Sequence, residues 1–201
     1  MMDAFSYLSV LLSIILGLAI AQVLQGYRAI LLARGRVRLS APALIWSGLL
    51  LLFAAQAWWA SFGLREREHW DFLSFAVILL QMILLYMLTA IVLPDVPAEQ
   101  PIDLERHFER HRKAFFGFLI AMLASSIGKE IVLEHRLTSL LNLAFHVVFA
   151  GAAAAGMIFG GRKAQLALAL FGVAGFLAYI AILFANLPFD YSAIAPSLRT
   201  H

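Results

Sequence analysis

A small group of polar side chains interrupts sequence that is otherwise apolar, and these are the side chains that could do chemistry. They are Gln56, Gln81, Ser125, Ser126, Lys129, Glu130, Asn142 and His146. Ser126 and Glu130 are four residues apart, so they share one face if this segment is helical. Asn142 and His146 have the same spacing. Because histidine titrates near neutral pH and ionisable groups inside membranes mark ion or proton pathways, Glu130 and His146 are candidate proton or cation ligands, with Lys129 as their counter-charge.

Two other arrangements of residues carry weaker predictions. His107 and His111 are four residues apart, but zinc needs a third or fourth ligand and basic residues surround the pair. We therefore interpret them as part of a solvated helix face. Ser125 and Lys129 have a spacing that a Ser–Lys dyad could use, which makes an intramembrane enzyme the third-ranked hypothesis. We predict no catalytic residue, no metal site and no cofactor.

The amino-acid composition indicates whether the chain folds in water or in a lipid bilayer. Of the 201 residues, 63% are hydrophobic and 13% are charged, and there is no cysteine. Soluble domains carry about 25% charged and about 45–50% apolar residues. The chain is therefore neither an ordinary soluble domain nor a disordered segment, and it has no disulfide framework. The remaining class is the integral membrane protein, with a single membrane domain over residues 1–201.

Long uncharged stretches predict six transmembrane helices. A helix needs about 20 residues to cross a hydrocarbon core about 30 Å thick. Five uncharged stretches are long enough, and a sixth reaches this length when it is extended past Lys129 and Glu130. We expect an all-α polytopic integral membrane protein, a compact bundle of six transmembrane helices at about residues 4–27, 39–64, 72–94, 114–134, 137–161 and 164–189.

A proline-rich segment at residues 94–101 divides the chain into two halves of three spans each. Each proline removes a backbone donor and restricts the preceding residue, so we predict a cytoplasmic linker. A duplicated second half would be inverted, as in many transporters. Asp103 is a candidate cap for a helix over residues 103–113 that leads into span 4. That helix either projects straight from the span or bends along the membrane surface.

Lysine and arginine are unevenly divided between the two sides of the predicted bundle. The 1–2, 3–4 and 5–6 loops hold ten of the 15, and the other side holds five. The positive-inside rule places the first side in the cytoplasm and both termini on the non-cytoplasmic side of a plasma or inner membrane. The arginine run at residues 34–38 then contacts anionic headgroups, and no nucleic-acid partner is predicted.

Counting 1.5 Å per residue from the outer face places most of the polar group about 8–15 Å deep. Polar side chains at this depth usually face the interior of a bundle, which predicts an outward-opening polar cavity on spans two to five. The competing interpretation is structural. In it, Lys129 extends to the headgroups, and His146 forms a hydrogen bond across to Gln81 or a serine.

Small side chains at four-residue spacing predict close contacts between membrane helices. The first, fifth and sixth spans have such residues, so we expect these spans at the centre of the bundle. Spans two and three, which carry larger apolar side chains, are then expected to face lipid or a partner. The predicted packing residues are Ser9, Ser13, Gly17, Ala21, Gly151 and Gly156.

Two functions follow from these features. The first is a small transporter or channel that uses the outward-opening polar cavity for a small ion or solute. The alternative is a non-catalytic membrane subunit or scaffold that docks a partner protein through its apolar helix faces. In both, the lipid bilayer is a partner, and we expect a homo-oligomer or a membrane-protein partner.

Overall fold

The computed structural model describes residues 4–33, 35–66, 70–95, 101–134 and 139–185. Within these ranges the chain forms six α-helices: α1 (Ala4–Leu32), α2 (Ala41–Ala60), α3 (Phe72–Val92), α4 (Leu104–Glu134), α5 (Leu140–Ile158) and α6 (Arg162–Ala185). All six are long and apolar enough to cross a membrane. The predicted class, an all-α six-helix membrane protein, is confirmed. A 3₁₀ helix, η1 (Ser61–Glu66), follows α2.

Local sequence determines where the helices begin and end. Asp71, Asp103 and Ser139 precede α3, α4 and α5, and each side chain accepts a hydrogen bond from the backbone N–H three residues further on, at 2.7, 2.8 and 3.3 Å. These caps satisfy N–H groups that have no partner within the helix. Pro94 follows closely on the end of α3, as expected from its effect on the preceding residue. Gly161 joins α5 to α6 with a φ of 93°, a conformation that favours glycine.

Helix α4 runs without a break from the cap at Asp103 to Glu134. Its 31 residues correspond to about 46 Å at 1.5 Å per residue, which exceeds the thickness of a hydrocarbon core of about 30 Å. Leu104 and Phe108, in its first turns, are buried against the rest of the protein. The segment before span 4 therefore continues the span in a straight line. It does not bend to lie on the membrane surface.

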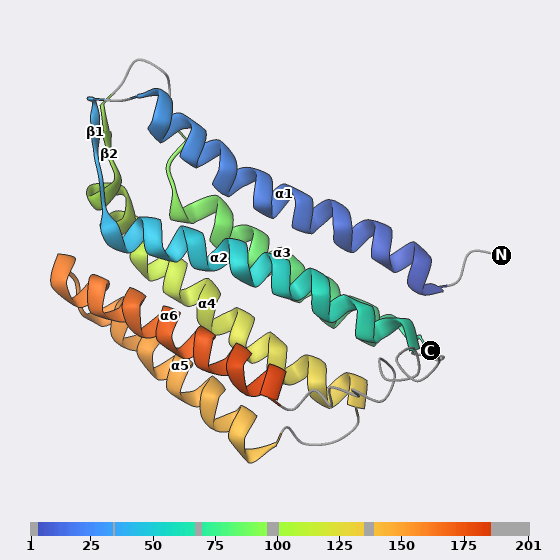
Figure 1. Ribbon diagram of the computed structural model, residues 1–201. Helices are drawn as coiled ribbons and strands as arrows, with labels where there is room; N and C mark the ends of the chain where they lie inside the picture. Colours follow the sequence, from blue (N-terminus) through green and yellow to red (C-terminus); the bar gives the residue numbers. More distant parts are fainter. Residues whose placement is uncertain (1–3, 34, 67–69, 96–100, 135–138, 186–201) are drawn as a thin grey trace, which may run out of the picture.

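The helices form a bundle whose central contacts join the two halves of the chain (Figure 1). α1 packs on α3, α3 on α4, α4 on α5, and α2 on α6. The internal packing of the halves differs, because the first half is dominated by the contact of α1 with α3 and the second by that of α4 with α5. The core is made largely by α1, α2, α3 and α4 and includes Trp46, Leu49, Leu50, Leu85, Leu88, Phe115 and Phe116.

A two-residue parallel ladder, not predicted from the sequence, ties the α1–α2 connection to the segment that precedes α4. β1 (Val37–Arg38) pairs with β2 (Ile102–Asp103) at the far end of the bundle from η1 (Figure 1). Arg38 forms ion pairs with Asp103 at 3.5 Å and with Glu105 at 3.3 Å. The Arg38 side chain is 67% exposed, so these ion pairs add little stability. They orient the connection between α1 and α2 relative to the start of α4.

The prediction that spans 1, 5 and 6 form the centre of the bundle is wrong for spans 5 and 6, which bury few of their described residues. Span 1 does pack into the core, but not through the predicted small residues. Ser13, Gly17 and Gly151 are exposed, while Ser9 and Ala21 are half-buried. α1 instead turns a leucine-rich stripe inward: Leu8, Leu12, Leu16 and Val23 are at most 3% exposed. α2 and α3, expected to face lipid or a partner, supply much of the core. Among the predicted packing residues only Gly156 lies buried at a close helix contact, against Phe116.

Because of this orientation, Gly17→Leu is expected to leave the fold of the single chain intact. A Cβ atom at position 17 has no atom of a neighbouring element within 4 Å in the described structure, and leucine has a higher helix propensity than glycine by roughly 1 kcal/mol. Unfolding by sodium dodecyl sulfate in mixed micelles, followed by circular dichroism, is expected to give wild-type stability or slightly more. A marked loss of stability would show that this face is covered by a second molecule.

Candidate functional site

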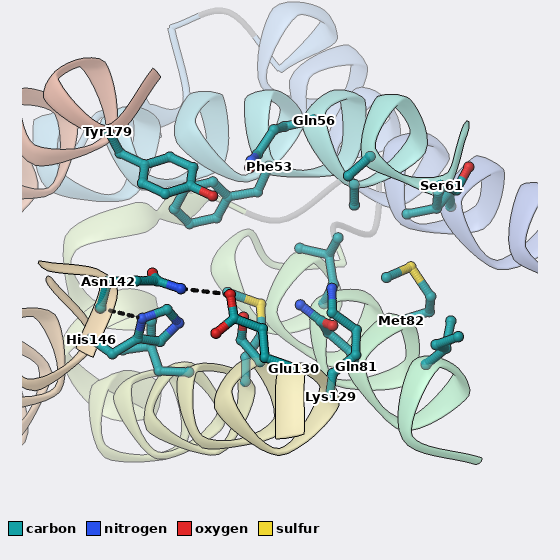
Figure 2. Close-up of a pocket in the computed structure, with 18 of the residues that line it drawn as sticks. Phe53, Gln56, Ser61, Gln81, Met82, Lys129, Glu130, Asn142, His146 and Tyr179 are labelled. Carbon is teal, nitrogen blue, oxygen red and sulfur yellow. Dashed lines mark hydrogen bonds between the residues drawn. The ribbon is translucent and has the colours of Figure 1, made fainter. Parts of the chain in front are cut away.

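A cavity of about 270 Å³ lies inside the bundle, and all six helices contribute to its wall (Figure 2). It extends toward the end of the bundle where α2 ends, because Ser61 and Leu64 of η1 line it. Seven of the eight residues predicted for the site also line it: Gln56, Gln81, Ser126, Lys129, Glu130, Asn142 and His146. Polar residues from four helices are therefore brought together as expected.

Helical periodicity determines which residues of α4 reach the cavity. Met122, Ser126, Lys129 and Glu130 lie at spacings of four, seven and eight residues, which places them along one face of the helix. Ser125, the eighth predicted residue, is rotated away from this face and does not line the cavity. Its hydroxyl oxygen is buried and forms no hydrogen bond with the described residues.

Asn142 links the two candidate ligand groups. Its Nδ2 donates a hydrogen bond of 2.6 Å to the Glu130 carboxylate, and its backbone carbonyl accepts a hydrogen bond of 2.8 Å from His146 Nδ1 (Figure 2). A carbonyl oxygen can only accept, so Nδ1 carries a proton. In the neutral ring Nε2 is then an acceptor. The hydrogen bond of His146 thus lies within α5 and leaves Nε2 for a second partner.

Two amide oxygens in the cavity wall have no partner among the described residues. Gln81 Oε1 and Asn142 Oδ1 are buried and accept no hydrogen bond from this part of the chain. A buried acceptor left without a donor costs about 1–3 kcal/mol. Together with the Glu130 carboxylate and His146 Nε2, these oxygens make the polar side of the cavity rich in acceptors.

Two pairs of polar side chains elsewhere in the membrane helices join one helix to another. Gln22 Nε2 donates to the Tyr86 hydroxyl at 3.3 Å and joins α1 to α3. The hydroxyls of Tyr27 and Ser47, 2.9 Å apart, join α1 to α2. These pairs hold helices together, which is the role that the structural interpretation assigned to the cavity residues. Unpartnered buried polar atoms also occur outside the cavity, at Trp46 Nε1, Ser125 Oγ and Gln165 Oε1. The cavity differs because two unpartnered acceptors line it together with Glu130 and His146.

The opposite wall of the cavity is largely aromatic, and the sequence did not point to it. Phe53 of α2 and Phe176 of α6 meet edge to face with ring centres 4.9 Å apart. Phe145 and Tyr179 meet in the same way at 6.4 Å. The Tyr179 hydroxyl points into the cavity, facing the polar side chains of α4 and α5 (Figure 2). Tyr179 is the one polar residue of α6 after its first turn, a signal that could have identified it.

An aromatic cluster closes the bundle on the other side of the cavity. Trp46 contacts Phe115 and Phe116 edge to face, with ring centres 5.4 and 5.7 Å apart, and Phe108 packs against Phe115 at 5.4 Å. All four side chains are at most 4% exposed. Because the three phenylalanines precede Met122 along α4, the cluster lies between the cavity and the end of the bundle that holds β1 and β2.

The histidine pair at the start of α4 has structural contacts. His107 Nε2 donates to the carbonyl of Ile91 at 2.9 Å, which fastens α4 to the last turn of α3. His111 Nδ1 donates to the carbonyl of His107 at 3.0 Å. Over the residues that the structure describes, no three His, Cys, Asp or Glu side chains are grouped closely enough to hold a metal ion.

Comparison with protein-family models, with curated proteins and with solved structures finds no match for this chain. The geometry of the cavity is therefore the basis for assigning a function.

Proposed function

We propose that the protein is a membrane transporter that binds a small solute in the cavity that all six helices line. The observation that carries this proposal is the pair of buried acceptors, Gln81 Oε1 and Asn142 Oδ1, that no described residue satisfies. Both line the same cavity as the Glu130 carboxylate and His146. Acceptors that cost free energy in the unliganded protein are satisfied when a donor-bearing solute binds.

The two ends of the bundle support a directional arrangement. The cavity extends to the η1 end, whereas the Trp46 cluster fills the interior toward the β1–β2 end. Within the described part of the chain, the cavity therefore lies toward the η1 end, where we propose that the solute enters. A transporter alternates between this arrangement and one in which the aromatic cluster separates and the η1 end closes.

The charge distribution favours an orientation in which the cavity opens outward. The β1–β2 end carries the basic connection between α1 and α2 and the basic first turns of α4 and α6 (Figure 1). By the positive-inside rule this end is cytoplasmic, and α1 begins and α6 ends on the non-cytoplasmic side. A plasma or inner membrane is the location that fits this orientation.

The native chain lacks cysteine, so single-cysteine variants test the proposal directly. Ser126→Cys and Ser125→Cys are nearly isosteric neighbours on α4, and only position 126 lines the cavity. A membrane-impermeant methanethiosulfonate is expected to label Ser126→Cys in right-side-out vesicles by an order of magnitude faster than Ser125→Cys. Labelling of Ser126→Cys is also expected in inside-out vesicles, more slowly, because transport requires access from both sides.

Arg36→Cys is the orientation control, since residue 36 is exposed at the β1–β2 end and should react only in inside-out vesicles. If Ser126→Cys reacts from neither side, the cavity is closed to water and the subunit or scaffold function becomes the better explanation. If it reacts from the outer side alone, the cavity is open to one side only and the transport proposal fails.

A further inference from the structure

We propose that the solute is a small primary ammonium ion with an apolar or aromatic body; this inference rests on the proposed function and names the substrate class of the same cavity. The acceptor-rich side comprises the Glu130 carboxylate, the amide oxygens of Gln81 and Asn142, and His146 Nε2. An ammonium group has three N–H donors and no acceptor. It therefore matches this side both in charge and in hydrogen-bonding capacity.

The position of Lys129 is compatible with a cationic solute. The Glu130 carboxylate turns toward Asn142, from which it accepts a hydrogen bond. In Figure 2, Lys129 lies on the other side of Glu130 from Asn142 and His146. An ammonium group near Asn142 and His146 thus has the carboxylate between it and the lysine. An anionic solute in the same place would meet the carboxylate and the amide oxygen of Asn142, which repel it.

The aromatic wall defines the rest of the solute. Phe53 and Tyr179 face the polar side chains of α4 and α5 across the cavity (Figure 2). Phe176 and Phe145 line the cavity in contact with these two rings, and aromatic faces attract cations as well as apolar groups. An inorganic cation would leave this wall unused. The volume of about 270 Å³ lies just below the range of about 300–1,000 Å³ for drug-sized ligands, so the body is small, on the scale of one aromatic ring.

The test compares three small molecules of similar shape on the full chain in lipid nanodiscs at neutral pH. Radiolabelled 2-phenylethylammonium is expected to bind saturably and to be displaced by the unlabelled compound. The neutral analogue 2-phenylethanol and the anionic analogue 3-phenylpropionate are expected to compete at least about tenfold more weakly, a difference of about 1.4 kcal/mol. Equal competition by the alcohol, stronger competition by the anion, or no saturable binding of the ammonium would overturn the inference.

Two variants test whether the Glu130 carboxylate binds the ammonium group. Glu130→Gln keeps the size of the side chain and removes its charge, and we expect at least about tenfold weaker binding of 2-phenylethylammonium. Glu105→Gln removes a carboxylate from the other end of α4, where it pairs with Arg38, and binding is expected to be unchanged. Glu130→Gln that elutes as folded protein and binds as tightly as wild type contradicts the assignment.

A second measurement does not depend on the folding of the Glu130 variant. Saturating 2-phenylethylammonium is expected to slow methanethiosulfonate labelling of Ser126→Cys, because both occupy the same cavity, whereas 2-phenylethanol at the same concentration should not. If Ser126→Cys is labelled from both sides but the ammonium gives no protection, the transport cavity stands and the substrate class is wrong. If Ser126→Cys is labelled from neither side, the proposed function itself fails.

Discussion

Gly156→Leu is expected to destabilise the protein by about 3 kcal/mol, near the upper end of the usual range for overpacking a core. A Cβ atom at position 156 would lie 2.5 Å from the Phe116 ring, closer than the 3.0 Å that real Cβ atoms keep. Phe116 is 1% exposed and is held edge to face by Trp46 and Phe115. The ring has nowhere to turn, so α4 and α5 must separate.

Gly151→Leu is the matched control on the same helix. A Cβ atom at position 151 has no atom of a neighbouring element within 4 Å in the described structure, residue 151 is exposed, and the substitution is expected to be neutral. Both variants are measured by unfolding in sodium dodecyl sulfate mixed micelles, with circular dichroism as the signal. Equal stabilities for the two variants would show that α4 and α5 do not meet at Gly156.

A double-mutant cycle makes the comparison specific to one contact. Phe116→Ala alone loses packing, but it also removes the ring that blocks a side chain at position 156. We therefore expect the Gly156→Leu/Phe116→Ala double variant to be more stable than the sum of the two single losses predicts, with a coupling between about 0.5 and 3 kcal/mol. Strict additivity would mean that the loss in Gly156→Leu arises elsewhere.

The six helices were predictable because hydrocarbon leaves the backbone few alternatives. An uncharged run of about 20 residues has to form a helix there, and the caps at Asp71 and Ser139 are readable as sequence. The full lengths of α1 and α4 were harder to predict from the sequence. Arg28 and the basic residues after Leu104 marked the limit of the apolar spans, but a charge does not end a helix, and both helices continue through these positions.

The orientation of the helices within the bundle was not predictable from periodicity. α1 has two stripes of similar period, the small residues around Ser13 and Gly17 and the leucines around Leu12 and Leu16. In water the apolar stripe would be chosen as the inner one. In a bilayer both the lipid and the protein interior accept leucine, so the sequence offers no reason to choose, and the choice of the small residues was wrong.

The polar residues of the cavity were more predictable for the same physical reason. Lipid tails do not accept a carboxylate or an amide, so Glu130 and Gln81 had to face the interior once the spans were known. Ser125 and Ser126 show the limit of this argument, since adjacent residues differ by about 100° around a helix and depth alone does not separate them. Tyr179 was overlooked because tyrosine is counted with the apolar residues.

Arg112→Met is expected to destabilise the protein by about 3 kcal/mol, through the loss of two hydrogen bonds from a charged donor at roughly 1.5 kcal/mol or more each. Arg112 Nη1 of α4 donates to the carbonyls of Gly156 and Met157 at 3.1 and 2.7 Å. These oxygens belong to the last turn of α5, where carbonyls have no partner within the helix and a positive charge is favoured. Methionine keeps much of the apolar stem and removes every donor.

Lysine is not expected to restore the loss in full. Arg112 also pairs through Nε with Glu109 at 2.9 Å, so one planar group binds two carbonyls and a carboxylate at once. An ammonium is a compact point charge without this fork, and Arg112→Lys should fall between wild type and Arg112→Met. Arg110→Met, which removes an exposed arginine two residues away, is the control and should be neutral. If Arg112→Met and Arg110→Met unfold at the same detergent concentration, the arginine contacts do not hold the end of α5 against α4.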